Sequence, residues 1–383
     1  MVPRPPLPRF LLIPAVAVAL FACAPVQVVP HPTPGPAAGP AAVSAPARTP
    51  PPESPELAAY TIPQTPEWTD KYINSDPQAD IRYFRIKKLM ADFGLSRFQA
   101  IELQNHYRDL TRVKVPPAQA FQDALSAVRA GRSGSSVDLE KLRSAPFIVV
   151  LDLDETLYQR SPSYRSGSTG PQWRDFSFQA GADESFVKLR PGWEQAIRRL
   201  RALGGMVILF TASPDLIAEG VTSKWLAAGG APVLSLVDGL LSKSHLVLQE
   251  KSDGDPIVLP SKDLRIFDES LERVIIIDDN PKLIVQHHRH RLIKKFQADP
   301  YLAAKLAGRG LAAPFEAGLP AIVKEIEESL QYGKEHHVAL GPAYLPYTLL
   351  GSVAMEALIQ GGMTPAAARL YIRQNPGFVD ERF

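Results

Sequence analysis

Residues 147–157 read FIVVLDLDETL, a run of five apolar residues followed by two aspartates, Asp152 and Asp154. A short, continuous and mostly β-branched run is typical of a strand that is covered on both faces of a sheet. Because side chains alternate along a strand, two aspartates separated by one residue point to the same side. Their like charges repel unless a cation neutralises them, and Mg²⁺ favours such oxygen ligands. The stretch therefore predicts a buried strand with a cation-dependent site at its tip.

Three further apolar runs have the same character: MVILFT at 206–211, PVLSLV at 232–237 and VIIID at 274–278. We predict a strand at each of them. Between the runs the pattern is helical, as in residues 191–203, where Pro191 suits the first helical turn and two glycines mark the exit. Buried strands that alternate with helices predict an α/β fold, a doubly wound parallel sheet whose reactive groups lie at the carboxyl ends of the strands.

Polar residues follow two of these other predicted strands. Residues 211–213 (TAS) offer a hydroxyl and backbone amides that can bind phosphate oxygens at a helix N-terminus. Asp278 and Asp279 add a second pair of carboxylates. Lys262 precedes this pair and could neutralise phosphate charge without acting as a base. Together these elements indicate phosphoryl chemistry.

The motifs DLDETL, LRPG, LFTAS, KDL and IIIDDNP occur in this order. In that order they resemble the haloacid dehalogenase superfamily, and most closely its branch that includes the RNA polymerase C-terminal-domain phosphatases and the small phosphatases related to them. The resemblance extends over residues 145–330, about half of the chain. It implies a Rossmann-like α/β core and hydrolysis of phosphoric monoesters.

Matched to these motifs, the resemblance gives each residue a role. Asp152 attacks the phosphorus and becomes an aspartyl-phosphate, while Asp154 protonates the leaving alcohol and then activates the hydrolytic water. Thr211 and Lys262 bind and orient the transferring phosphoryl group. Asp154 also favours phosphoryl transfer over dehalogenation, because the dehalogenases of the superfamily lack this second acid.

The resemblance also implies a Mg²⁺ cofactor. Its ligands would be the Asp152 carboxylate, the main-chain carbonyl of Asp154 and the Asp279 side chain, with Asp278 close by or acting through water. The enzyme expected from this chain is a Mg²⁺-dependent phosphomonoesterase that works through an aspartyl-phosphate intermediate.

The segments that could form a cap over the site are short. Residues 157–188 and 214–261 are each too short for a full cap domain, so we expect a small cap and an open site. Such a site suits a phosphoprotein or another exposed phosphoester. Two alternatives remain: a periplasmic lipoprotein acid phosphatase or nucleotidase that acts on small phosphate esters, and a non-catalytic envelope interaction protein.

Some residues near the motifs allow two interpretations. Trp173, Phe176 and Phe178 either form a flap at the entrance or pack locally, and Arg190 of LRPG either binds substrate or positions its loop. Residues 287–290 (HHRH) lack the spacing of a zinc site, so the favoured interpretation is an exposed basic helix end.

Helical segments flank the predicted phosphatase domain, residues 144–332. Residues 67–143 are predicted as a helical extension in which Ser96 and Gln99 are placed as a capping box. We expect this extension to pack on the phosphatase domain, with a separate interaction module as the alternative. Residues 333–383 are predicted as a helical C-terminal tail.

The first residues predict export. Residues 1–22 combine arginines with an apolar run and are interpreted as a lipoprotein signal peptide. Cys23, the one cysteine of the chain, follows Leu-Phe-Ala in a pattern that resembles a bacterial lipobox, and we expect it to be lipidated. Residues 23–66 are rich in proline and alanine and predict an extended tether. The protein is therefore expected to be exported and lipid-anchored to the bacterial envelope, at the outer membrane and facing the periplasm.

Charge argues against a nucleic acid partner. The formal net charge is +2, and removal of Arg4 and Arg9 with the signal peptide would leave none. No basic footprint for nucleic acid then remains. The expected partners are a phosphoester substrate and, through Cys23, the membrane.

Overall fold

A computed structural model describes residues 55–62, 82–132, 134, 136–161, 173–181, 183–248, 260–308 and 310–379. The predicted signal peptide, Cys23 and most of the predicted tether lie outside these residues. Among the helices in the described ranges, none is both long and apolar enough to span a membrane.

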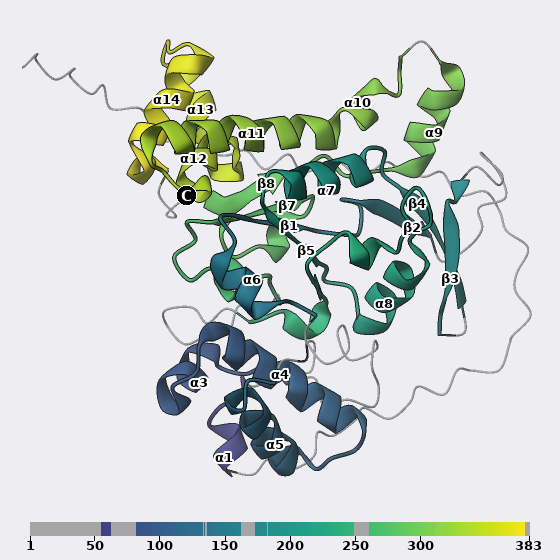
Figure 1. The fold of residues 1–383 in the computed structure, drawn as a ribbon, viewed down its shortest axis with the longest axis vertical. Coiled ribbons are helices and arrows are strands. Elements are labelled where there is room, and N and C mark those ends of the chain that lie inside the picture. The colour runs from purple at the N-terminus through teal and green to yellow at the C-terminus, as the bar shows by residue number, and fades with distance from the viewer. Residues whose placement is uncertain are drawn as a thin grey trace, which may run out of the picture. The chain divides into compact units, whose positions relative to one another are not determined.

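A five-stranded parallel sheet forms the centre of the described part (Figure 1). Its order is β6-β5-β1-β7-β8, with β1 at Ile148–Leu151, β5 at Met206–Phe210, β6 at Leu240–Leu241, β7 at Val274–Asp278 and β8 at His290–Leu292. The middle strand, β1, pairs with β5 on one side and β7 on the other. The predicted α/β fold with a parallel sheet is confirmed, as are the strands predicted in the first, second and fourth apolar runs.

The strand predicted at 232–237 is wrong. Val233–Ser235 form a short 3₁₀ helix, and the chain joins the sheet only at β6. Pro232 has no N–H for a strand partner, and Leu234 is exposed. Asp238 makes the junction instead: its backbone N–H donates to Val207 O at 2.7 Å, and its carboxylate accepts from Val207 N at 2.8 Å.

The edge strand β8 corrects the interpretation of the histidines. His287–Arg289 form a 3₁₀ turn, and His290 begins β8. His290 is fully buried, and its Nε2 lies 2.9 Å from the carbonyl oxygen of Asp278. Burial lowers the pKa of His287 and His290, and burial together with Arg289 and His287 lowers that of His288 to about 4. These residues are therefore not an exposed basic helix end.

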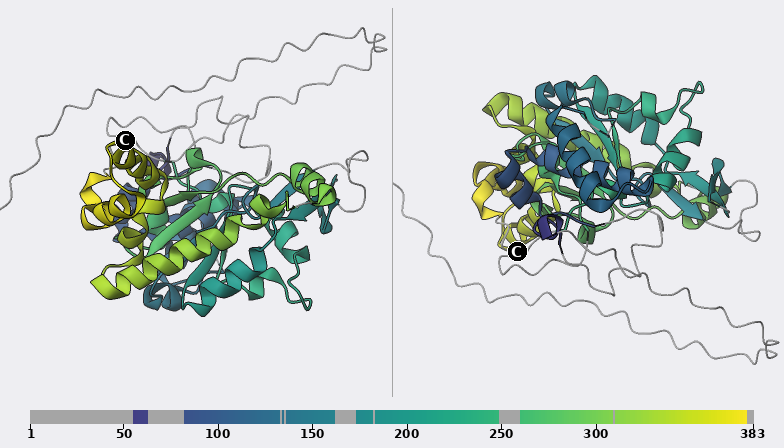
Figure 2. Two further views of the ribbon diagram at one scale, coloured as in Figure 1. Left: turned by 90° about the horizontal axis from the view of Figure 1, so that it is seen from above. Right: turned by 90° about the horizontal axis from the view of Figure 1, so that it is seen from below.

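Helices cover one face of the sheet in the usual α/β manner. These are α7 (Trp193–Ala202), α8 (Asp215–Lys224) and α11 (Gly318–His336), and α11 lies across the sheet when seen from above (Figure 2). Their apolar side chains share one cluster with alternate strand residues such as Val149 and Ile275. Helix α7 begins two residues after Pro191 because Gly192, its N-cap, takes φ 79°.

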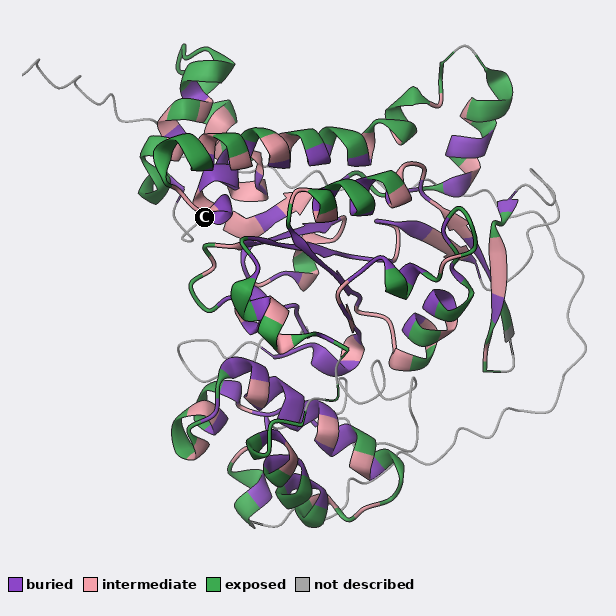
Figure 3. Ribbon diagram, in the orientation of Figure 1, coloured by how far each residue is buried: buried purple, intermediate pink, exposed green. Residues whose placement is uncertain are grey.

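The N-terminal helices belong to the core of the other face. They are α1 (Pro55–Ala58), α3 (Ile86–Phe93), α4 (Arg97–Arg112), α5 (Pro117–Arg129) and α6 (Leu139–Ser144). Their apolar residues form one continuous cluster with the remaining alternate strand residues, among them Ile148, Val150 and Ile208. The helical extension therefore packs on the α/β domain, as expected. Buried positions gather in the sheet and along the inner side of α4 (Figure 3).

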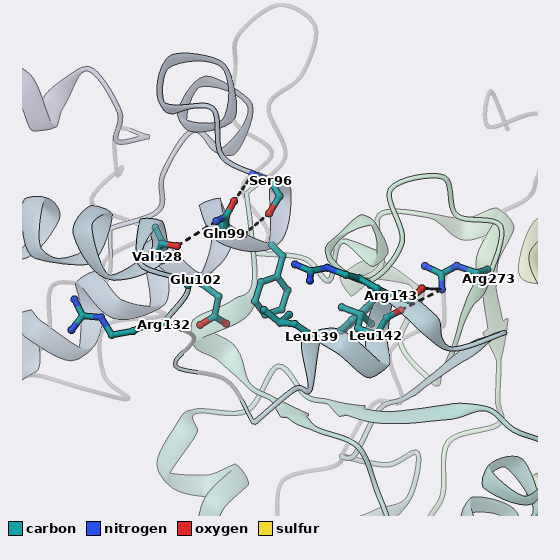
Figure 4. A pocket seen from close by; sticks show the side chains of 12 residues that line it. Ser96, Gln99, Glu102, Val128, Arg132, Leu139, Leu142, Arg143 and Arg273 are labelled. Atoms are coloured by element: carbon teal, nitrogen blue, oxygen red, sulfur yellow. Dashed lines mark hydrogen bonds between the residues drawn. The ribbon is translucent and has the colours of Figure 1, made fainter.

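Helix α4 begins as its sequence predicts. Ser96 Oγ accepts from Gln99 N at 3.2 Å, and Gln99 Oε1 accepts from Ser96 N at 2.9 Å, which confirms the capping box (Figure 4). Nearby, Arg273 donates to the carbonyl oxygens of Leu142, Arg143 and Ala145 and so ties the end of α6 to the start of β7.

Part of the predicted tether is folded. Leu57 of α1 and Ile62 are buried, and Ile62 N donates to Tyr83 O at 2.8 Å. Residues 55–62 thus differ from the extended spacer that their prolines and alanines predicted. Their few large apolar residues are enough to bind them to the helical extension.

A three-stranded antiparallel sheet, ordered β2-β4-β3, is the small cap. Its strands are β2 (Tyr158–Ser161), β3 (Phe176–Ala180) and β4 (Asp183–Leu189). Phe178 packs so closely on α8 that a Cβ at Gly220 would lie 2.5 Å from its ring. The Trp173 indole N–H donates to Asp299 Oδ1 at 2.6 Å. Of the two interpretations of these aromatic residues, local packing agrees with the structure.

The C-terminal part is helical. It contains α9 (Ala298–Ala307), α10 (Ala313–Glu316), α11, α12 (Leu340–Tyr344), α13 (Leu349–Gln360) and α14 (Pro365–Gln374). The predicted boundary between residues 332 and 333 falls inside α11, which continues to His336. Leu345, Ile372 and Val379 form a small core of their own.

Leu103→Ala tests whether the extension and the sheet share one core. Leu103 of α4 is fully buried in the shared cluster. We expect the free energy of unfolding to fall by about 2–5 kcal/mol, because the truncation leaves a cavity. Urea unfolding should remain a single transition for helix and tryptophan signals. Leu306→Ala, at a side chain that is 64% exposed, is the matched control and should change the value by less than about 0.5 kcal/mol. A transition that splits into two would contradict the shared core.

Candidate active site

A buried lysine joins two of the strand tips. Lys262 is fully buried, and its Nζ lies 2.6 Å from Asp152 Oδ1 and 2.6 Å from Asp278 Oδ2. Asp152 directly follows β1 and Asp278 ends β7, so the pairing of these strands brings the two carboxylates together. The lysine backbone is fixed as well, because Lys262 N donates to Leu283 O and Lys262 O accepts from Val285 N.

Lys262 is one positive charge between the two carboxyl groups of Asp152 and Asp278. Burial raises the pKa of Asp152 well above its usual range, and Asp278 raises it further, against the opposing effect of Lys262. Burial alone would lower the pKa of Lys262, but the carboxylates of Asp152 and Asp278 raise it above its ordinary value. The lysine therefore keeps its charge, and one cation faces two carboxylates. A further cation would favour the ionised form of Asp152.

Asp154 has a separate set of partners. Its Oδ2 accepts from Thr211 Oγ1 at 2.9 Å and from Ser213 Oγ at 2.8 Å, and Ser213 N donates to Thr211 Oγ1 at 2.9 Å. Thr211 directly follows β5, the other neighbour of β1. The hydroxyl predicted to bind phosphate is thus hydrogen-bonded to the predicted proton donor.

Asp279 completes the acidic cluster. Its Oδ1 accepts from Thr156 Oγ1 at 3.0 Å, and its backbone N–H donates to the same hydroxyl at 3.1 Å. Burial raises the pKa of Asp279; the Thr156 hydrogen bond opposes this effect and Asp278 adds to it. Carboxylate oxygens of Asp152, Asp278 and Asp279 lie within 4.8 Å of one another. This oxygen-rich group fits a hard divalent cation. The Asp154 carboxylate is not a member of this group.

These residues open onto a cavity of about 270 Å³. Its lining comes from all three strand tips and includes Asp152, Asp154, Thr211, Ser213 and Asp279. Lys262 does not line the cavity, because it lies behind the carboxylates that it bridges.

Arg190 stabilises the turn after Asp154 by a hydrogen bond to the backbone of Glu155. Glu155 takes the left-handed conformation with φ 62°, and its carbonyl oxygen accepts from Arg190 Nη2 at 3.3 Å and from Phe296 N at 2.6 Å. The same Nη2 donates to Lys294 O at 2.5 Å, and Arg190 is buried. Of the two interpretations of this arginine, positioning of the loop agrees with the structure.

Two contacts were missed by sequence reasoning. Thr156 supports Asp279, and Ser213 supports Asp154. Both residues stand inside the motifs DLDETL and LFTAS, so their position beside a strand tip was the available signal. Their partners could not be assigned, because each contact joins segments that are distant along the chain.

A parallel sheet with carboxylates, hydroxyls and a lysine at the carboxyl ends of its central strands has the arrangement of a phosphoryl-transfer enzyme. Residues 147–302 match the model of the NLI interacting factor-like phosphatase family. This segment is therefore similar to the phosphatase domains of that family, and the enzyme is a phosphoric monoester hydrolase.

Two solved structures are similar in part. One is a variant of the fission yeast RNA polymerase II CTD phosphatase Fcp1 bound to beryllium fluoride, at 15% identity and TM-score 0.32, covering 61% of this chain and 72% of that one. The other is Fcp1, described as an essential RNA polymerase II CTD phosphatase, at 18% identity and TM-score 0.32, covering 60% and 58%. Comparison with curated proteins finds no match.

Lys262→Met tests the buried charge group. The variant leaves Asp152 and Asp278 buried without their cation, so we expect a loss of about 3–5 kcal/mol in the free energy of unfolding at neutral pH with EDTA present. The pKa of Asp152, which burial already raises above the unfolded value, would rise further once Lys262 no longer opposes that effect. The deficit should therefore shrink as pH falls and Asp152 binds a proton.

Lys224→Met, at an exposed lysine in the last turn of α8, is the control for this substitution. It should change stability by less than about 0.5 kcal/mol. Equal unfolding curves for Lys262→Met and the parent protein would mean that the two carboxylates do not depend on this lysine.

Proposed function

We propose that the enzyme is a Mg²⁺-dependent phosphomonoesterase that forms an aspartyl-phosphate on Asp152. The observation that carries the proposal is the three-carboxylate cluster of Asp152, Asp278 and Asp279, with Asp154 held apart on two hydroxyls. This separation supports two different tasks for the two aspartates of one strand tip. Mg²⁺ held by the cluster would supply charge stabilisation for the phosphoryl group.

In the first step Asp152 attacks the phosphorus through its free carboxylate oxygen, while Oδ1 stays on Lys262. The P–O bond to the substrate alcohol breaks, and Asp154 gives its proton to the departing oxygen. Because both hydroxyl contacts use Asp154 Oδ2, the other oxygen can carry that proton. The products are the alcohol and an acyl phosphate on Asp152.

In the second step Asp154, now ionised, takes a proton from a water molecule that attacks the phosphorus. The bond between Asp152 and phosphorus breaks, inorganic phosphate leaves, and both aspartates return to their starting states. Lys262 stays charged throughout and limits the repulsion between Asp152 and Asp278.

For the substrate we propose a phosphoprotein or another large phosphoester. The support is the size of the cap, which in the described residues is a three-stranded sheet of short strands packed at the side of α8. Two solved structures that are similar to part of this chain are named as RNA polymerase II CTD phosphatases. The nuclear polymerase itself is not part of this proposal.

Asp152→Asn tests the chemistry. Hydrolysis of p-nitrophenyl phosphate by the full chain should require added Mg²⁺, and kcat should fall by a factor on the order of 10⁴ or more in the variant, because an amide is not a nucleophile here. Asp123→Asn on the exposed side of α5 is the control and should leave kcat unchanged. Equal activity of Asp152→Asn and the parent enzyme would exclude the proposed intermediate.

The substrate class is tested by comparing kcat/KM for phosphoserine peptides with that for nucleoside monophosphates. We expect the peptides to be preferred by at least about tenfold, which corresponds to about 1.4 kcal/mol of differential transition-state binding. Preference for the nucleotides would favour a phosphatase for small esters instead. Activity on neither class, in an enzyme active on p-nitrophenyl phosphate, would also contradict this substrate proposal.

A further inference from the structure

Helix α4 of the extension buries an unusual number of polar side chains. Arg97, Glu102, Gln104, Asn105 and Arg108 are each less than 9% exposed. Such residues are seldom buried without a specific partner. Several of their partners lie in segments of the phosphatase domain next to the active site, namely residues 242–246 and Asp263, the neighbour of Lys262.

Two of these side chains hold backbone carbonyls of the 242–246 loop. Arg108 stacks over the Tyr83 ring at 4.5 Å, and its Nη1 donates to Ser244 O at 2.6 Å. Gln104 Nε2 donates to Leu246 O at 2.8 Å, while its Oε1 accepts from Phe84 N at 3.0 Å. Each of the two side chains therefore has a second contact, Arg108 with Tyr83 and Gln104 with Phe84, besides the loop carbonyl to which it donates. The position of the loop then depends on the position of α4.

The same loop holds the turn that supports Asp154. Lys243 N donates to Ser213 O at 3.0 Å, and Ser242 Oγ donates to Asp215 Oδ1 at 2.5 Å. Arg112 of α4 also donates to Asp215 Oδ2, at 3.1 Å. Burial would raise the pKa of Asp215, but the hydrogen bonds from Ser242, Ser244 and Arg112 outweigh it and lower the pKa.

We propose that Arg108, Gln104 and Arg112 are positioning residues for the proton donor Asp154. Arg108 and Gln104 hold the 242–246 loop directly, and Arg112 holds it through Asp215 and Ser242. The loop in turn holds Ser213, whose hydroxyl lies 2.8 Å from Asp154 Oδ2. The proposal rests on the proposed role of Asp154. Proton transfer in the transition state depends on placement to within a fraction of an ångström. A less firmly held loop should therefore slow the protonation of the leaving oxygen by Asp154 and leave the rate of attack by Asp152 unchanged.

Leaving-group dependence measures that step directly. Phenyl phosphate needs a proton on its departing oxygen, whereas 2,4-dinitrophenolate leaves without one. In Arg108→Met we expect kcat/KM for phenyl phosphate to fall about 10- to 100-fold and kcat/KM for 2,4-dinitrophenyl phosphate to fall less than about threefold. We compare kcat/KM because it covers the steps up to departure of the alcohol and not the later hydrolysis, in which Asp154 serves both substrates alike. Arg108→Lys keeps a donor and should recover part of the loss. Equal losses on both substrates would overturn the proposal, since they indicate only less folded enzyme.

Arg112→Gln keeps the proposal testable if Arg108→Met does not fold. Its side chain is 41% exposed, so the variant should fold normally, and the loss on phenyl phosphate should be about two- to fivefold larger than on the dinitrophenyl ester. Arg129→Met, at an exposed arginine of α5, is the matched control and should leave the ratio unchanged. An unchanged ratio in Arg112→Gln would overturn the proposal.

Asp154→Asn separates this inference from the proposed function. Selective loss on phenyl phosphate in Asp154→Asn, with an unaltered ratio in Arg108→Met, would overturn the positioning role alone. No selective loss in Asp154→Asn would overturn the proton-donor role and the positioning role together. Selective loss in both variants, with the donor restored in Arg108→Lys, is the expected result.

Discussion

The salt bridges of Lys262 with Asp152 and Asp278 constrain the rest of the site. An ammonium group with no exposed surface is tolerated only beside carboxylates, and these two carboxylates repel each other without it. The bridge can form only if β1 and β7 are neighbours and the segment after β7 holds the lysine backbone. The order of the strands, the course of residues 260–285 and the charge of Asp152 therefore depend on one another.

The α/β domain does not end where its motifs end. Alternate residues of β1, β5 and β7 lie in two clusters, and one of these continues into α3–α6. The N-terminal helices thus take the place of the second helical layer that a doubly wound sheet requires. A helix in that place can carry polar groups inward to the loops of the site, which a helix attached at the surface could not do.

Much of this fold could be predicted from the sequence, because buried strands and catalytic tips are local patterns. Residues 147–157 specified the central strand and its two aspartates directly. The failure at 232–237 had a local cause, the missing N–H of Pro232, combined with the side chain of Asp238 taking a backbone partner. The contacts of Thr156, Ser213 and Arg108 were beyond reach, because each depends on a segment that only the folded chain brings near.

The central position of β1 also sets the order of assembly. Its two neighbouring strands follow it in the sequence, β5 first and β7 much later. The apolar residues of β1 are therefore covered fully only after both have been synthesised. Parallel pairing across such separations is slow and leaves hydrophobic surface open during synthesis. The extension emerges before any strand and can shield only one face of β1. Asp152 therefore has its complete surroundings only once the chain through Asp278 is present, and a chain interrupted before Asp278 would leave apolar residues of β1 exposed and lack the site.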